Sequence, residues 1–220
     1  MELATDATTL VVAGAWNAAI LTPAWVLRHG LERDAEGDQG RVQIFLPALQ
    51  GGALDFPRFS LDEFQYIVRP DSLIVIPAAA PGSFEVAEEA AAKVLSVLVH
   101  TPVSGVGHNF EFRDADPDAE HVEAFASARR DISEQIPVGW NSAGASLASA
   151  FRNEAGTVQM NVHRVFENGS LTVKFNFHHT VSDAAQAVQV LRGEAGRLRM
   201  SANLDLATRL VNSLYGDGNQ

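Results

Sequence analysis

The sequence contains no cysteine, and this absence excludes disulfide bonds, thiolate metal ligands, cysteine nucleophiles and cysteine-held iron–sulfur clusters. It also lacks a long apolar run, because Gly14, Trp16 and Asn17 interrupt the stretch from Leu10 to Leu21. No stretch reaches the roughly 18 apolar residues that a membrane span needs. The N-terminus is acidic where a secretory signal is basic. We therefore expect a soluble, cytoplasmic protein without a membrane partner.

Basic residues are scarce, and lysine occurs only as Lys93 and Lys174. The 16 Lys and Arg residues stand against 27 Asp and Glu residues, which gives a net charge of −11. Such an acidic chain repels the phosphate backbone of nucleic acids, and Arg129-Arg130 is its one adjacent basic pair. We expect no direct nucleic-acid binding. The acidity suits solubility, or attraction of a basic protein partner.

The remaining composition is that of a packed globular protein. Apolar residues make up 46% of the 220 positions and charged residues 20%. No internal repeat, low-complexity tract or shift of composition divides the chain. The sequence therefore predicts a single domain that spans residues 1–220.

Local patterns predict an α+β fold. Short or alternating apolar runs predict strands over residues 9–13, 41–46, 64–68, 73–76 and 103–112. Apolar residues at helical spacing predict helices near residues 24–31, 84–99, 118–136 and 183–191, and a helical C-terminus. Thr22 and Ser83 are the expected caps of the first two helices. We expect antiparallel strands in two groups, with three to four packed helices.

The strongest local signal is a β-hairpin over about residues 157–179. Asn168-Gly169 lies between two alternating segments, and this dipeptide favours a two-residue turn with positive φ at both positions. The turn fixes a register that pairs Val162 with Phe175 and His163 with Lys174. Residues 147–152 are a candidate third strand.

This register separates an apolar face of the hairpin from a polar one. The polar face carries the residues that we name as a candidate ligand or partner face: Gln159, Asn161, His163, Asn176 and His178, with Lys174 beside them. Polar side chains on one side of a strand pair are typical of an antiparallel sheet that is covered on its other side.

One motif is a candidate catalytic site. It is the segment His-His-Thr-Val-Ser-Asp from His178 to Asp183, at a strand-to-helix junction. It resembles the His-His-x-x-x-Asp-Gly signature of chloramphenicol acetyltransferases, condensation domains and plant-type acyltransferases. The resemblance implies that His179 is a general base and Asp183 a structural acid paired with an arginine. It covers about seven residues, and Ala184 replaces the final glycine of the signature.

A structural explanation of the same motif competes with the catalytic one. Thr180 and Asp183 have the spacing of a helix capping box. His179 falls on the apolar face of its strand with Phe175 and Phe177, where a hydrogen-bonded core histidine is common.

No metal site is expected. The run Asp114-x-Asp116-x-Asp118 resembles the start of a calcium loop, but Ala119 replaces its glycine and Phe125 its closing acid. We also expect no cofactor.

We expect a noncatalytic interaction or assembly subunit that self-associates or docks to another protein, because no sequence constellation reaches the density of convergent polar groups that catalysis needs. The alternatives are an acyltransferase built on His179 and a small-ligand binder that uses the polar face of the hairpin.

Overall fold

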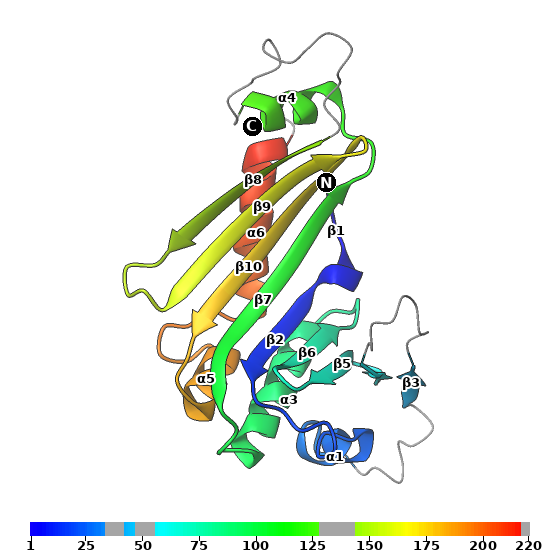
Figure 1. Ribbon diagram of the computed structural model, residues 1–220, viewed down its shortest axis with the longest axis vertical. Coiled ribbons are helices and arrows are strands. Elements are labelled where there is room, and N and C mark those ends of the chain that lie inside the picture. Colours follow the sequence, from blue (N-terminus) through cyan, green and yellow to red (C-terminus); the bar gives the residue numbers. More distant parts are fainter. Residues whose placement is uncertain (34–41, 47–55, 128–143, 217–220) are drawn as a thin grey trace.

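The computed structural model describes residues 1–33, 42–46, 56–127 and 144–216. Its centre is one ten-stranded antiparallel sheet, with the order β3-β4-β5-β6-β2-β7-β10-β9-β8 and with β1 paired to β7 (Figure 1). The strands are β1 (Glu2–Leu3), β2 (Thr9–Gly14), β3 (Gln43–Phe45), β4 (Arg58–Ser60), β5 (Phe64–Arg69), β6 (Ser72–Pro77), β7 (Val103–Asp114), β8 (Gly144–Arg152), β9 (Val158–Glu167) and β10 (Ser170–Thr180).

Helices pack against one face of this sheet. Helices α3 (Ser83–Val97), α5 (Ala184–Arg192) and α6 (Met200–Tyr215) contact its central strands. Helix α1 (Pro23–His29) packs on α3, and α4 (Ala119–Ser127) packs on α6. A short 3₁₀ turn spans Thr5–Ala7. Figure 1 views the sheet from its other side, with α6 behind the strands. No helix of the described ranges covers this side, which we call the open face.

The expected α+β class is confirmed, with one correction to its layout. The two expected groups of strands form a single sheet, because β2 pairs with β6 on one side and with β7 on the other. The described residues hold five α-helices. Helix α4 covers the first part of the helix expected over residues 118–136, and positions 128–136 lie outside the described residues. None of the described helices is both long and apolar enough to cross a membrane.

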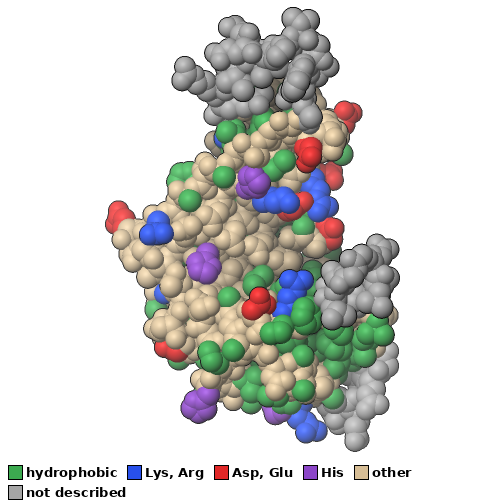
Figure 2. Space-filling model, in the orientation of Figure 1, with side chains coloured by type: hydrophobic (Ala, Val, Ile, Leu, Met, Phe, Trp, Pro, Cys, Tyr) green, Lys and Arg blue, Asp and Glu red, His purple; other side chains and the backbone are tan. Residues whose placement is uncertain are grey.

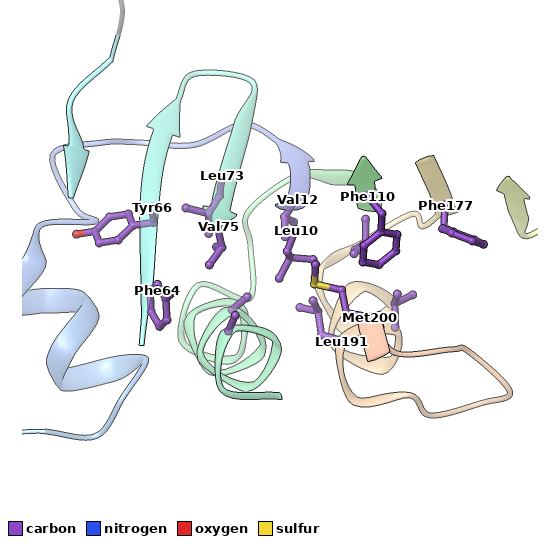
Figure 3. Close-up of a cluster of buried hydrophobic side chains, with 14 of the residues drawn as sticks. Leu10, Val12, Phe64, Tyr66, Leu73, Val75, Phe110, Phe177, Leu191 and Met200 are labelled. Atoms are coloured by element: carbon purple, nitrogen blue, oxygen red, sulfur yellow. The ribbon is translucent and has the colours of Figure 1, made fainter. Parts of the chain in front are cut away.

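The core lies between the sheet and the helices. Side chains from one face of the central strands, including Leu10, Phe110 and Phe177, point toward Leu191 of α5 and Met200 of α6 (Figure 3). Each of these five side chains is at most 2% exposed. Strand residues at alternate positions supply one side of the core, and the intervening side chains are therefore directed to the open face.

The hairpin prediction is confirmed in its turn and in its register. Asn168 and Gly169 have φ values of 52° and 79°, as the turn requires. Val162 pairs with Phe175. His163 pairs with Lys174, and β8 adds the third strand beside β9.

The helix caps agree with the sequence only in part. Thr22 caps α1 through its side-chain oxygen, which accepts a hydrogen bond from the Trp25 amide. The expectation for Ser83 is wrong: Gly82, with a φ of 77°, is the cap of α3, and Ser83 is the first helical residue. The Ser83 hydroxyl instead donates to the Ala78 carbonyl oxygen.

Candidate functional site

A row of polar side chains crosses the centre of the open face. Asn161 of β9, Asn176 of β10, Asn109 of β7 and Thr9 of β2 are directly opposite one another on four neighbouring strands. Ala150 of β8 continues the row beyond Asn161. Residues that pair across an antiparallel sheet share one face, so these five positions form a straight line across the strands. We call this line the amide row.

The polar side chains of the amide row are hydrogen-bonded in one direction. The Asn161 amide nitrogen donates to the Asn176 carbonyl oxygen at 3.0 Å, and Asn176 donates in turn to Asn109 at 2.7 Å. Asn109 then donates to the Thr9 hydroxyl at 3.0 Å. Because every bond has the same sense, the side-chain dipoles add along the row and strengthen one another.

Two further hydrogen bonds connect the edge strand β8 to the amide row. Arg152 of β8 donates to the side-chain oxygen of Gln159 at 2.9 Å. The Gln159 amide nitrogen donates to the oxygen of Asn161 at 2.8 Å. The continuous series of hydrogen bonds therefore starts at the guanidinium of Arg152 on β8 and ends at the hydroxyl of Thr9 on β2.

Glycines on β7 leave room for the polar side chains. A Cβ atom placed on Gly105 would lie 2.5 Å from Cε1 of His178, so the imidazole of His178 lies over this glycine. A Cβ on Gly107 would lie 3.5 Å from the amide nitrogen of Asn176. The absence of a side chain at Gly105 and Gly107 thus gives room to His178 and Asn176 on the neighbouring strand β10.

The surroundings of the amide row carry little charge. Figure 2 shows a broad area over β8, β9, β10 and β7 without acidic or basic side chains, which lie mostly along its margins. Lys174 and Glu111, each two residues along its strand from Asn176 and Asn109, form an ion pair at 3.2 Å, and Arg113 lies 2.6 Å from the same Glu111. The solvent side of a sheet usually carries many Lys and Glu side chains, and depletion of charge is a property of interface centres.

The amide row also opposes the ordinary preferences of β-strands. Asparagine is depleted in strands, yet three asparagines are aligned on three adjacent strands. Positions where local preference is broken are the expected places for function.

The five candidate residues of the polar face are therefore all on the open face. Asn161 and Asn176 form the middle of the amide row, and Gln159 joins it through Asn161. His178 lies beside the row over Gly105, and the exposed His163 pairs in register with Lys174.

His179 is on the opposite side of the sheet, inside the core, and is fully buried. Its Nε2 atom lies 3.4 Å from the amide nitrogen of Asn203 on α6. The same nitrogen of Asn203 lies 2.9 Å from Nδ1 of His108, which is also fully buried. One amide group thus joins two core histidines from neighbouring strands.

We infer the proton positions of both rings from the contacts of the Asn203 amide nitrogen. An amide nitrogen can only donate, so Nδ1 of His108 and Nε2 of His179 are acceptors. Each neutral ring then carries its proton on the other nitrogen. The Nε2 proton of His108 faces Glu88, whose carboxylate oxygen is 3.8 Å away. Glu88 is in turn bonded by Arg199 at 2.9 Å and by the Met200 amide at 2.8 Å.

Both core histidines are neutral at pH 7. Burial lowers the pKa of His179 to about 4, and the charges of Arg197 and His178 act in the same direction. Burial also lowers the pKa of His108 to about 3, with His179 as the further cause. Burial raises the pKa of Glu88, and its bonds to Met200 and Arg199 oppose that shift. An imidazole with a pKa near 4 is a weak general base at neutral pH.

Asp183 caps helix α5, which begins at Ala184. The expected capping box from Thr180 is displaced by three residues, because Thr180 ends strand β10 and Asp183 is itself the cap. Its carboxylate accepts hydrogen bonds from the Gln186 amide at 2.8 Å and the Ser182 hydroxyl at 3.0 Å. These bonds lower the pKa of Asp183. Within the described ranges no arginine forms an ion pair with Asp183.

Several members of these two sites cannot be found by sequence reasoning. Asn109, Thr9 and Arg152 enter the open-face network from strands outside the hairpin, and Asn203 and Glu88 enter the buried cluster from helices. The alternation of β7 indicates the face of Asn109, but nothing local indicates which strands are its neighbours. In the part of the chain that the structure describes, no three His, Asp or Glu residues form a possible metal site.

The comparison of this chain with the models of known protein families and with curated proteins gives no match.

Proposed function

We propose that the protein is a noncatalytic assembly subunit, and that its open face binds the open face of a second copy. The observation that supports this role is the amide row in its uncharged surroundings. Three further arguments favour a second copy as the occupant: the unused hydrogen-bonding capacity of the row, its direction, and the distribution of charge.

The amide row is complementary to itself. Each of its three asparagines receives one hydrogen bond and donates one. A carboxamide has two N–H groups and two carbonyl lone pairs. One donor and one acceptor of each asparagine are therefore left for a partner. A second row offers the same groups, which is the requirement of an interface with twofold symmetry.

The direction of the row fixes how two copies meet. The bonds run from β9 toward β2, and two such dipoles attract when they are antiparallel. A twofold axis above Asn176 produces this arrangement. Asn176 then faces Asn176 of the second copy, Asn161 faces Asn109, and Ala150 faces Thr9.

The charge distribution permits this approach despite the net charge of −11. Most acidic and basic side chains that Figure 2 shows on this face lie at its margin. Lys174 and Glu111, which are nearest to the amide row, are paired with each other at 3.2 Å, so neither enters the interface as an unpaired charge. The overall repulsion between two acidic copies is screened by salt over about 8 Å at physiological ionic strength. Association should therefore strengthen from low to moderate salt, whereas a basic partner would bind more weakly.

Sedimentation velocity over a range of protein concentrations tests the proposal. The unaltered chain should sediment as a concentration-dependent dimer, and Asn176→Lys should be a monomer because two ammonium groups would face each other. Asn212→Lys is the matched control, since Asn212 is exposed on α6 in the helix layer. This control should dimerise as the unaltered chain does. If Asn176→Lys does not fold, Ala150→Lys at the exposed edge of the row replaces it.

A monomer at every concentration for the unaltered chain would overturn the proposal, and so would a folded Asn176→Lys variant that dimerises normally. Chemical cross-linking gives an independent measurement. Because the chain has no cysteine, Asn176→Cys introduces a single thiol. Two sheets packed face to face are about 10 Å apart, so a short reagent that bridges two thiols should join two Asn176→Cys chains and should not join two Asn212→Cys chains.

A further inference from the structure

A cavity of about 320 Å³ lies on the helix side of the sheet. It is bounded by β8, β9 and β10, by the loop between α5 and α6, and by α6 itself. Its walls are mainly apolar and include Phe151, Val158, Met160, Phe177, Leu198 and Leu206. Phe151 and Leu198 are 55% and 50% exposed, respectively, whereas Phe177 is packed in the core. Large apolar side chains at the rim of a cavity are typical of a binding site for a small molecule.

The buried part of the polar lining of this cavity comes from the buried cluster, whereas Arg152 and Asn153 line its exposed edge. His179 and Asn203 both line it, and both side chains are at least 99% buried. Both N–H groups of the Asn203 amide are directed to the two histidines. The proton of neutral His179 is therefore on Nδ1, and this atom has no hydrogen-bond partner in the described residues. A buried donor without an acceptor destabilises the folded state.

We propose that this cavity binds a small neutral ligand with an apolar body and a carbonyl oxygen, which accepts the hydrogen bond from Nδ1 of His179. The apolar walls bind the hydrocarbon part, and the carbonyl oxygen satisfies the unpartnered donor. Medium-chain ketones and esters belong to this class. The site is on the opposite side of the sheet from the amide row, so its occupation does not depend on self-association.

The chemistry of the cluster selects a neutral ligand. His179 is uncharged at neutral pH because burial lowers its pKa. A carboxylate beside it would lose its water and gain no charge from His179, and the nearby Arg197 already donates to the Thr157 carbonyl oxygen. Arg152 at the edge of the cavity already donates to Gln159 on the open face. A neutral carbonyl oxygen has a much smaller desolvation cost and needs one donor.

Methionine methyl signals in an NMR titration provide the test, with 2-octanone as the probe. The chain has 3 methionines, at positions 1, 160 and 200. Met160 lines the cavity, whereas Met1 precedes strand β1, which pairs with the far end of β7. The ketone should shift the Met160 signal in a saturable manner and leave the Met1 signal unchanged. Octanoate at neutral pH should bind at least tenfold more weakly.

Two variants separate this site from non-specific apolar contact. Leu198→Trp fills the cavity from its exposed rim and should weaken ketone binding at least tenfold. Val99→Trp is the matched control, because Val99 is similarly exposed, at 57%, outside the cavity. Its affinity should stay within twofold of that of the unaltered chain. The absence of a saturable Met160 shift would overturn the proposal, as would equal affinity for octanoate or equal binding by Leu198→Trp.

Discussion

Replacement of Asn203 by Ala tests whether the buried cluster stabilises the fold. The change leaves Nδ1 of His108 and Nε2 of His179 without a donor. Each unpartnered buried acceptor costs about 1–3 kcal/mol. The higher helix propensity of alanine offsets roughly 0.5 kcal/mol of this loss of stability. We expect the free energy of unfolding to fall by about 1.5–5.5 kcal/mol.

Urea denaturation followed by circular dichroism measures this change directly. In a thermal melt, 1 kcal/mol corresponds to about 2–4 °C for a chain of this size, so the expected loss is on the order of 3–20 °C. Asn212→Ala is the matched control. It makes the same substitution on the exposed side of the same helix, and its effect should stay within about 0.5 kcal/mol. If Asn203→Ala is also within about 0.5 kcal/mol of the unaltered chain, the cluster does not stabilise the fold and the reasoning is refuted.

Three other predictions follow from the same structure. Gly169→Val should lower the free energy of unfolding by about 1 kcal/mol or more, measured by urea denaturation, because a β-branched residue resists the φ of 79° at this turn; no loss would contradict the turn geometry. The pKa of His179 falls from 6.5 to about 4 on folding, so this side chain should lower the stability of the protein by on the order of 3 kcal/mol as the pH falls from about 6.5 to 4. His108, whose pKa is lowered to about 3, acts in the same direction. Glu88, whose pKa is raised, changes the stability in the opposite direction as the pH falls. The contribution of His179 is therefore measured by comparison with a His179→Phe variant, whose stability should depend less on pH. Identical curves of stability against pH would argue against a buried neutral His179. Finally, fluorescence anisotropy at moderate salt should detect no duplex DNA binding by this acidic chain, and salt-sensitive micromolar binding would contradict that expectation.

The acyltransferase alternative can be tested at His179 as well. It requires thioester turnover that disappears in a stably folded His179→Ala variant. The noncatalytic proposal expects no turnover by the unaltered chain and a lower melting temperature for the variant, because the change leaves Asn203 without one of its acceptors.

Sequence reasoning succeeds where the determining signal is local. The Asn168-Gly169 turn sets the pairing of Val162 with Phe175, since the two strands follow each other directly and the turn geometry fixes their register. The polar face of the hairpin follows from this register by simple alternation. For the same reason Asn161 and Asn176 are found without knowledge of the remaining sheet.

The part of the amide row that sequence reasoning does not find depends on contacts between distant segments. Asn109 meets Asn176, which is 67 residues away, and Thr9 meets Asn109 across 100 residues. No local pattern specifies which strands become neighbours at such separations. The cap of α5 is a different case. Thr180 and Asp183 both suit a cap, and pairing with β7 continues through Thr180, so the strand ends only there and the helix starts three residues later than the capping pattern predicts.

The position of β7 has a consequence for the time course of folding. This strand pairs with β2 on one side and with β10 on the other, so its neighbours come from residues 9–14 and 170–180. During synthesis, β2, β6 and β7 leave the ribosome well before β10. One long edge of β7, including the buried Phe110 and Phe112, is without its neighbour until the chain reaches about residue 180. An unpaired apolar edge is a site of misassembly during folding. The nascent chain is therefore expected to need protection by chaperones during this interval, and slow translation between residues 114 and 180 should increase aggregation.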